Sequence, residues 1–281
     1  MDRFGPLVDA SWLREHLDEV VVADVRWRYN GDVAERFAAG HVPGAVLVDL
    51  DEDLADSPGG RRGRHPLPSP EAFAAAMGRL GVGDEDTVVA YDDVRGSVAA
   101  RLWWMLRTTR HRAALLDGGL EAWPGPLETG PPRPRSEASF SARPWPSDRV
   151  LRTEEVERLR TDPGTVILDL RAAERYRGET EPIDPVAGHI PGARSAPWSG
   201  NVDEAGRFRS PEELRRRYES LGASGRRVVV HCGSGVTACH ALVALEVAGL
   251  PEGELYVDSW SGWVADPARP VAAGEDPGES T

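Results

Sequence analysis

The second half of this 281-residue chain repeats short motifs of the first half in the same order. Four pairs of segments carry the repeat: Asp-Val-Arg at 24–26 and Asp-Leu-Arg at 169–171, Gly-His-Val-Pro-Gly-Ala at 40–45 and Gly-His-Ile-Pro-Gly-Ala at 188–193, Ser-Pro-Glu at 69–71 and 210–212, and Leu-Asp-Gly-Gly-Leu-Glu-Ala-Trp at 116–123 and Tyr-Val-Asp-Ser-Trp-Ser-Gly-Trp at 256–263. So long a repeat unit is typical of a duplicated domain and excludes a short-period solenoid. We therefore expect two related domains.

Within each half, short apolar runs alternate with helical patterns. The runs at 20–23, 87–91 and 228–230 predict buried strands, and the patterns at 97–107 and 241–248 predict helices. This alternation predicts an α/β fold in which each domain is a small parallel sheet with helices on both faces. Ligands of such sheets bind beyond the carboxyl ends of the strands, so we expect the functional residues to lie at those ends.

A proline-rich stretch separates the two halves. Pro124-Gly125-Pro126 and the run from Gly130 to Ser136 contain too much proline for a packed element and predict an extended linker. We therefore predict a first domain at residues 1–125, the linker at 126–149 and a second domain at 150–281. The Ser-Pro-Glu motif predicts a helix start in each domain, with serine as the cap and proline as the first helical residue.

Cys232 occupies an expected strand-to-helix turn in the second half. It follows the strand at 228–230 and opens the sequence Cys-Gly-Ser-Gly-Val-Thr at 232–237. The glycines let the backbone curl until successive N–H groups point at the cysteine sulfur, and the following helix adds its positive end. These features favour the thiolate, which is the nucleophilic form of cysteine. The alternative is a small residue that closes a buried strand.

The sequence at 232–237 resembles the active-site loop of the rhodanese-type sulfurtransferases, in the form found in 3-mercaptopyruvate sulfurtransferases. The resemblance runs from about Asp9 to about Val271 and implies a tandem rhodanese fold with one active site at the domain interface. It implies that Cys232 takes up a sulfur atom as a persulfide and passes it on. The amides of Gly233, Gly235, Val236 and Thr237 would stabilise the bound group without a metal or an organic cofactor.

The first half lacks this chemistry. The position that matches Cys232 holds Asp92, and a carboxylate cannot carry a persulfide. One active copy beside one inactive copy is similar to the pattern of two-domain rhodaneses. We therefore expect a single sulfur-transfer centre in the chain.

The resemblance assigns two more residues of the second half to the site. Arg175 aligns with a family arginine that binds the substrate carboxylate, a group that guanidinium recognises at two points; an exposed helical charge is the alternative. Family members often carry a second arginine after the next Glu-Pro, where this chain has Ile183. Ser234 is expected to relay a proton to the departing carbon. Half of the expected anion clamp is therefore missing from this loop.

The histidines of the two Gly-His-x-Pro-Gly motifs carry different predictions. His189 is expected to be structural, with its ring bonded to backbone. For His41, the resemblance implies a position near the catalytic cysteine, together with an aspartate that aligns with Asp32. The alternative for His41 is a second structural histidine, and the alternative for Asp32 is a solvated turn residue after Gly31.

Four residues around the loop could suggest a zinc site, namely His231, Cys232, Cys239 and His240. Cys239 and His240 are adjacent on the expected helix and point to different faces, and no second Cys/His pair exists elsewhere in the sequence. We therefore expect no metal, no cofactor and a core position for Cys239. The two cysteines flank a turn and a helix start, which makes a disulfide improbable and favours a reducing compartment.

The net charge narrows the range of partners. A charge of −13 and a pI of about 5.1 argue against nucleic acid and anionic membrane, which both need a basic face. No apolar stretch reaches transmembrane length, and the first residues lack the apolar core of a signal peptide. We expect a cytoplasmic enzyme that uses a small-molecule sulfur donor and a thiol acceptor, such as thioredoxin or a small thiol, with cyanide as an acceptor in vitro.

Mercaptopyruvate is the expected donor. Thiosulfate is a dianion, and thiosulfate-preferring relatives place basic residues directly after the cysteine, where this chain has Gly233 and Ser234. A thiosulfate sulfurtransferase is the alternative within the class, and a sulfur carrier or redox sensor without turnover is the alternative outside it. A phosphatase with the same loop is disfavoured, because its loop closes on an arginine and this one closes on Thr237.

Overall fold

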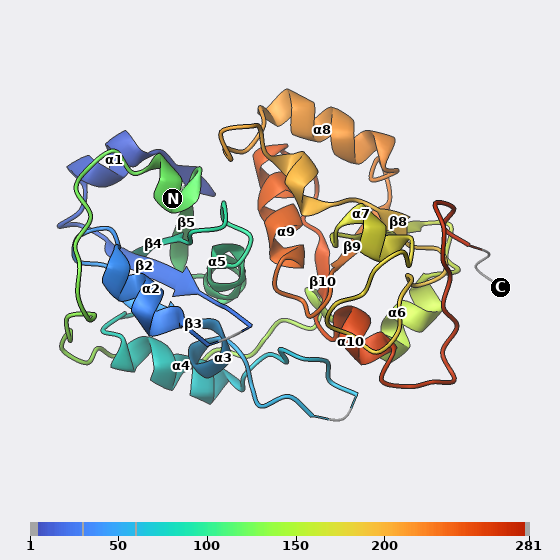
Figure 1. Ribbon diagram of the computed structural model, residues 1–281, viewed down its shortest axis with the longest axis horizontal. Helices are drawn as coiled ribbons and strands as arrows, with labels where there is room; N and C mark the ends of the chain where they lie inside the picture. The colour runs from blue at the N-terminus through green and yellow to red at the C-terminus, as the bar shows by residue number, and fades with distance from the viewer. Residues whose placement is uncertain (1–4, 30, 60, 279–281) are drawn as a thin grey trace. The chain divides into compact units, whose positions relative to one another are not determined.

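The computed structural model describes residues 5–29, 31–59 and 61–278, which divide between two compact units (Figure 1). The first unit comprises Met1–Asp56, Leu67–Pro146 and Glu204–Arg207, and the second comprises Ser57–Pro66, Ser147–Asp203 and Phe208–Thr281. Each unit thus contains a short segment from the other half of the sequence, and the internal repeat gives no sign of this exchange. Within the described ranges, no helix is long and apolar enough to cross a lipid bilayer.

A five-stranded parallel sheet forms the centre of the first unit, in the order β1-β5-β4-β2-β3. Its strands are β1 (Leu7–Val8), β2 (Val21–Arg26), β3 (Val46–Asp49), β4 (Thr87–Tyr91) and β5 (Arg112–Leu116). Its helices are α1 (Ala10–Glu15), α2 (Val33–Ala39), α3 (Leu50–Asp53), α4 (Pro70–Arg79), α5 (Ala99–Thr108) and the 3-10 turn η1 (Gly119–Ala122). Strand β4 is therefore the central strand of this sheet.

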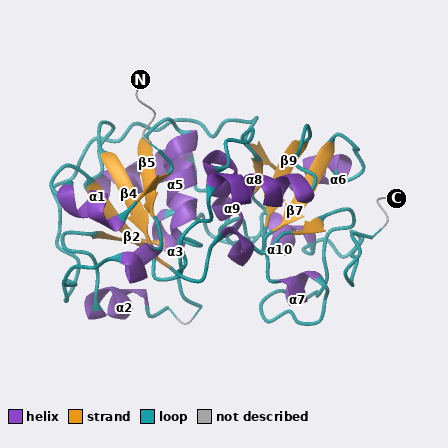
Figure 2. Ribbon diagram, turned by 90° about the horizontal axis from the view of Figure 1, so that it is seen from above, coloured by secondary structure: helices purple, strands orange, loops and turns teal. Residues whose placement is uncertain are grey.

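The second unit repeats this arrangement with a parallel sheet in the order β6-β10-β9-β7-β8. Its strands are β6 (Val150–Leu151), β7 (Thr165–Asp169), β8 (Arg194–Ser195), β9 (Arg227–His231) and β10 (Glu254–Tyr256). Its helices are α6 (Thr153–Leu159), α7 (Ala173–Tyr176), η2 (Trp198–Asn201), α8 (Pro211–Ser220), α9 (Ala238–Val247) and α10 (Ser259–Trp263). Helices flank both sheets (Figure 2). The predicted α/β fold with two related parallel sheets is confirmed.

The central strands are apolar on both faces and are buried on both faces. Val88, Val89 and Ala90 of β4 are at most 1% exposed, and Val229 and Val230 of β9 are fully buried. This burial is typical of a parallel sheet that helices cover on both sides. Burying each valine contributes about 1.5–3 kcal/mol. The loops that follow β4 and β9 therefore start from rigid positions.

Side chains and loops determine where the helices begin. Ser69 Oγ accepts the Ala72 N–H (3.1 Å) before α4, and Ser210 Oγ accepts the Glu213 N–H (3.3 Å) before α8, as the Ser-Pro-Glu motifs predict. Helix α5 begins at Ala99, later than the predicted start at residue 97. A buried carboxylate, described below, caps the helix at this point, because it accepts the N–H groups just before and at the first helical residue.

The repeated Asp-x-Arg motifs hold the repeated histidine turns in place. Arg26 donates to both carboxylate oxygens of Asp24 (2.6 and 2.8 Å) and to the carbonyl of the glycine that begins the first histidine motif (3.0 Å). Arg171 makes the same contacts in the second unit, to Asp169 and to the matching glycine carbonyl (both 2.6 Å). The repeat seen in the sequence is thus a repeated buried ion pair that ties the end of a strand to a turn.

The proline-rich stretch 126–146 lies along the first unit. Its backbone bonds to the unit at the Ala138 N–H, which donates to Gly78 O (3.0 Å), and at Ser139 O, which accepts the Asp84 N–H (3.1 Å). Further along, Trp145 Nε1 donates to Pro68 O (2.8 Å). The stretch contains no helix or extended strand among its described residues, yet these bonds fix its path along the unit.

Candidate active site

Cys232 directly follows β9, the central strand of the second sheet, and is only 3% exposed. The Cys232 N–H donates to Ser259 Oγ (3.2 Å), and the Cys232 carbonyl accepts the Trp260 N–H (3.0 Å). The Ser259 hydroxyl in turn donates to Tyr256 O (2.9 Å). The first turn of α10 therefore fixes both backbone groups of the cysteine.

The loop 233–237 curls tightly between β9 and α9. Gly235 has a positive φ of 76°, and a β-carbon there would lie 2.6 Å from Val257 O, so only glycine fits. The Gly233 carbonyl accepts the Ser261 N–H (2.9 Å). Among the described residues, the N–H groups of Ser234, Val236 and Ala238 donate no hydrogen bond to the protein. At the start of a ten-residue helix, these open amides make the loop suited to bind negative charge.

Ser234 faces a histidine that the sequence analysis did not identify. Its hydroxyl lies 2.7 Å from Nδ1 of His65, and the two residues are 6% and 5% exposed. His65 comes from the short first-half segment that belongs to the second unit. Because hydroxyl and imidazole can each donate or accept, this pair can pass a proton. The signal in the sequence is weak, a histidine between Arg64 and Pro66 in the loop before the first Ser-Pro-Glu motif.

Two guanidinium groups lie over Gly233. Arg175, the predicted carboxylate-binding residue, donates through Nε and Nη2 to Glu181 (3.2 and 2.6 Å). A β-carbon added to Gly233 would lie 3.6 Å from Arg175 Nη2 and 3.2 Å from Nη2 of Arg64. The structure therefore brings Arg175 to the loop and adds Arg64, a second cation that the sequence analysis did not include in the site.

A buried ion pair between Arg171 and Asp169 lies near the Cys232 loop. Burial opposes the charge of Arg171, but Asp169 and Glu181 hold the pKa of this guanidinium above its ordinary value. Burial likewise opposes the charge of Asp169, but Arg171 holds the pKa of this carboxyl below its usual range. Burial lowers the pKa of His231, so its imidazole, 3.7 Å from Asp169, favours the neutral form. The charge of Arg171 is thus maintained beneath the loop, and a negative sulfur at Cys232 adds to its stabilisation.

His41 and His189 have matching surroundings in the two units. His41 Nδ1 lies 2.9 Å from Phe37 O, and its ring stacks on Phe37 at 3.8 Å. His189 Nδ1 lies 2.8 Å from Tyr176 O, and its ring stacks on Tyr176 at the same distance. The bond predicted between the His189 ring and backbone is confirmed by this contact. His41 has the same contacts, and its predicted catalytic role stays a prediction.

The remaining predicted residues are placed as follows. Asp32 is a half-buried residue before α2 in the first unit, where its carbonyl accepts the Arg36 N–H (3.1 Å). Cys239 is fully buried on α9, as predicted, and its Sγ contacts Gly235 O at 3.4 Å. His240 is fully buried and stacks on Phe208 at 4.3 Å. Thr237 is half-buried at the cap position of α9.

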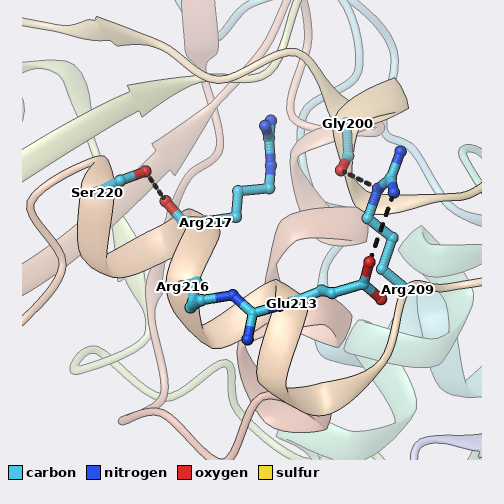
Figure 3. A pocket seen from close by; sticks show the side chains of 6 residues that line it. All are labelled: Gly200, Arg209, Glu213, Arg216, Arg217 and Ser220. Atoms are coloured by element: carbon cyan, nitrogen blue, oxygen red, sulfur yellow. Dashed lines mark hydrogen bonds and ion pairs between the residues drawn. The ribbon is translucent and has the colours of Figure 1, made fainter.

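A hollow of about 480 Å³ lies along α8 of the same unit (Figure 3). Its lining is rich in arginine and consists of Gly200, Arg209, Glu213, Arg216, Arg217 and Ser220. Arg209 donates to Gly200 O (3.1 Å), and Arg217 donates to Asn201 Oδ1 (3.2 Å). The hollow shares no lining residue with the Cys232 loop, so it is no part of the candidate site.

The chain matches known proteins over nearly its full length. Residues 9–125 and 152–266 each match the rhodanese-like domain. A probable 3-mercaptopyruvate sulfurtransferase of Pseudomonas aeruginosa is 42% identical over 280 residues, which cover 96% of this chain and 98% of the relative. A putative thiosulfate sulfurtransferase, SseB, of Mycobacterium tuberculosis is 39% identical over 92% of both chains. The 3-mercaptopyruvate sulfurtransferase of Homo sapiens is 35% identical over 92% of this chain and 91% of its own.

Solved structures agree with this similarity. The 3-mercaptopyruvate sulfurtransferase SseA of Escherichia coli superposes with a TM-score of 0.79 at 35% identity, covering 92% of this chain and all of that one. An enzyme of the same name from Leishmania major superposes with a TM-score of 0.77 at 30% identity, over 92% of this chain and 73% of its own.

Proposed function

Because the chain belongs to the rhodanese family, we propose that it is a sulfurtransferase that moves sulfur from 3-mercaptopyruvate to a thiol acceptor through a persulfide on Cys232. The observation that carries this proposal is the loop around Cys232, where open amides lie beside the guanidinium of Arg175. The amides suit a negatively charged sulfur, and the guanidinium suits a carboxylate. A 2-oxo acid that carries sulfur on the next carbon has both groups.

The first half-reaction loads the cysteine. The Cys232 thiolate attacks the sulfur of the donor, so that a sulfur–sulfur bond forms while the carbon–sulfur bond of the donor breaks. The electron pair of that bond passes to carbon and gives the enolate of pyruvate. Ser234 donates a proton toward this enolate, and His65, 2.7 Å from its hydroxyl, restores that proton from solvent. The products are pyruvate and the Cys232 persulfide, with one proton taken up.

The second half-reaction unloads the cysteine. The thiolate of an acceptor attacks the outer sulfur of the persulfide, and the Cys232 thiolate leaves. The open amides of Ser234, Val236 and Ala238 stabilise the thiolate and the persulfide in turn. We propose thioredoxin or a small thiol as the acceptor and the cytoplasm as the location. Both cysteines are free thiols, which suits a reducing compartment.

A thiosulfate sulfurtransferase is the second candidate, and two observations favour it. The relative from Mycobacterium tuberculosis bears the name of a putative thiosulfate sulfurtransferase, and here Arg64 adds a second guanidinium beside Gly233. Two cations could offset the two charges of thiosulfate, although no basic side chain follows Cys232 in the loop itself.

Steady-state kinetics with both donors tests the proposal. We expect a higher kcat/KM for mercaptopyruvate than for thiosulfate, with cyanide or a reduced thioredoxin as acceptor. An equal or higher kcat/KM for thiosulfate would overturn the donor and favour the second candidate. Protein that takes up one sulfur atom and then stops, with every acceptor tried, would instead indicate a carrier or a sensor.

Mass spectrometry of protein treated with donor alone tests the site. We expect one added sulfur atom on Cys232. Cys232→Ser should abolish both the adduct and turnover, and Cys239→Ser, the matched control on α9, should keep both. An adduct on Cys239 would contradict the assignment.

A further inference from the structure

We infer that Arg64 is a substrate-binding residue that, together with Arg175, holds the anionic end of the sulfur donor over Gly233. This inference rests on the proposed function and names a specificity-determining residue for it. Arg64 would fill the place of the second arginine that the loop lacks at Ile183. We refer to the guanidiniums of Arg64 and Arg175 as the arginine pair.

One carboxylate holds both members of the arginine pair. Asp184 Oδ1 accepts from Arg64 Nη1 (2.6 Å), and its Oδ2 accepts from Arg175 Nη2 (3.4 Å). The side chain of Asp184 is only 4% exposed. The two guanidiniums are therefore anchored to the same buried group, which keeps them side by side.

Each guanidinium also keeps an edge that the protein does not use. Among the described residues, Arg64 Nη2 and Arg175 Nη1 donate no hydrogen bond, and both lie within 3.7 Å of the place where a β-carbon of Gly233 would be. Arg64 Nε is buried without a partner in the same set of residues. Donors held in place but unpaired, directly over the residue after Cys232, are suited to accept a carboxylate.

The backbone around Arg64 is built to hold this position. Gly63 has a positive φ of 78°, and a β-carbon there would collide with the carbonyl of Asp258. The Arg64 N–H donates to Ser261 Oγ (3.0 Å). The segment therefore rests on α10, the helix that also fixes Cys232, so the guanidinium and the cysteine share one support.

The loop with Ile183 explains why the second arginine is supplied from elsewhere. The N–H groups of Ile183 and Asp184 both donate to Glu181 Oε1 (3.1 Å each), which curls the loop and presents the carboxylate of Asp184 to Arg64. The loop thus supplies an anchor for a cation instead of the cation itself. Arg64 precedes His65, so one short segment supplies both the anion-binding group and the partner of Ser234.

Kinetics of matched variants test this role. We expect Arg64→Ala to lower kcat/KM for mercaptopyruvate about 10- to 100-fold, mainly through KM, which is typical for the loss of one charge-assisted contact. Arg64→Lys should recover part of that loss. Arg61→Ala is the matched control, because Arg61 lies in the same segment, and its side chain is 65% exposed and pairs with Asp266 (3.2 Å). A KM for Arg64→Ala equal to that of Arg61→Ala would overturn the inference.

A second experiment does not depend on turnover. Iodoacetate carries a carboxylate and iodoacetamide does not, and both alkylate a reactive cysteine. We expect the rate with iodoacetate divided by the rate with iodoacetamide at Cys232 to fall about tenfold in Arg64→Ala. In Arg61→Ala this ratio should equal that of the wild-type protein. Tandem mass spectrometry locates the alkylated cysteine. A constant ratio in both variants would overturn the role of Arg64. If the wild-type protein does not use mercaptopyruvate but Arg64→Ala still lowers the ratio of alkylation rates, the proposed donor is overturned and the anion-binding role of Arg64 stands.

Discussion

The loops after β4 and β9 occupy the same position in their sheets and hold negative charge in opposite ways. In the first unit the carboxylate of Asp92 is fully buried and accepts four backbone N–H groups, those of Val94, Gly96, Val98 and Ala99, at 2.7–2.8 Å. Burial raises the pKa of Asp92, and these four bonds act in the opposite direction. In the second unit the matching amides of Ser234, Val236 and Ala238 are open among the described residues.

This difference shows what the loop itself does. Its backbone forms an anion cradle whichever residue stands first, and the first residue decides whether the anion is internal or brought by a substrate. Asp92 fills its own cradle and leaves no room for chemistry. Cys232 leaves its cradle open for the charge of a thiolate or persulfide. We therefore expect the first unit to transfer no sulfur because its loop is already filled by Asp92, while its fold stays intact.

The largest expected effect comes from placing an aspartate, the residue at position 92 in the first unit, at position 232 in the second. Cys232→Asp should abolish turnover, because no persulfide can form. Its carboxylate should also take up the open amides, so that the free energy of unfolding exceeds that of Cys232→Ser by about 1.5–3 kcal/mol. Turnover assays and urea denaturation of both variants measure this. An aspartate variant less stable than the serine variant would show that the two loops are not equivalent cradles.

The next effect separates the two candidate histidines. His65→Ala should lower kcat about a hundredfold or more, because the Ser234 hydroxyl loses the partner that restores its proton. If His41 is a second structural histidine, as its contacts match those of His189, both His41→Ala and His189→Ala should lower stability alike and leave kcat per folded molecule nearly unchanged. Kinetics corrected for the folded fraction decide the matter. A kcat loss in His41→Ala that matches His65→Ala would support the catalytic roles predicted for His41 and Asp32.

A smaller effect is expected from removing the negative charge that the Asp92 loop binds. Asp92→Asn keeps the shape but turns its amide nitrogen toward backbone donors, so we expect a loss of about 1.5–3 kcal/mol in the free energy of unfolding. Sulfur loading of Cys232 should persist in the folded protein. Urea denaturation together with intact-mass analysis checks both statements. Unchanged stability would mean that the carboxylate does not hold the loop.

The smallest effect concerns pH and the residues before the two loops. Tyr91 donates to Asp24 (2.7 Å), whereas the matching His231 lies 3.7 Å from Asp169. Burial lowers the pKa of His231 below its ordinary 6.5, so the unfolded chain binds a proton before the folded one does. Stability should therefore fall as the pH drops below about 6.5, by at most about 1.4 kcal/mol per pH unit. His231→Gln should flatten this part of the profile; an identical profile would assign the slope to other groups.

The parts of the site that could be predicted are those encoded by neighbours in sequence. Cys232, Ser234 and the glycines form one uninterrupted motif between a strand and a helix, and the structure confirms that setting. Arg175 was placed by its family motif, and the duplicated motifs predicted both sheets. Periodicity located the strands but could not locate the start of α5, since that start depends on the carboxylate of Asp92.

Arg64 and His65 could not be predicted in this way. They reach the loop through a contact between residues far apart in the chain, His65 with Ser234, and their segment lies outside the four repeated motifs. Local patterns carry no information about such a contact. The same limit explains why the sequence suggested half of an anion clamp at Ile183, while Arg64 lies beside Gly233.

The exchange of segments between the two units bears on how this gene could be divided. A piece that starts near residue 150 would contain Cys232, its loop and all five strands of the second sheet, yet it would lack Arg64 and His65, which are encoded in the first half. Recombination or truncation at the linker would therefore yield the Cys232 loop without the histidine partner of Ser234. The first half of the sequence thus carries, in Arg64 and His65, part of the candidate site whose cysteine lies in the second half.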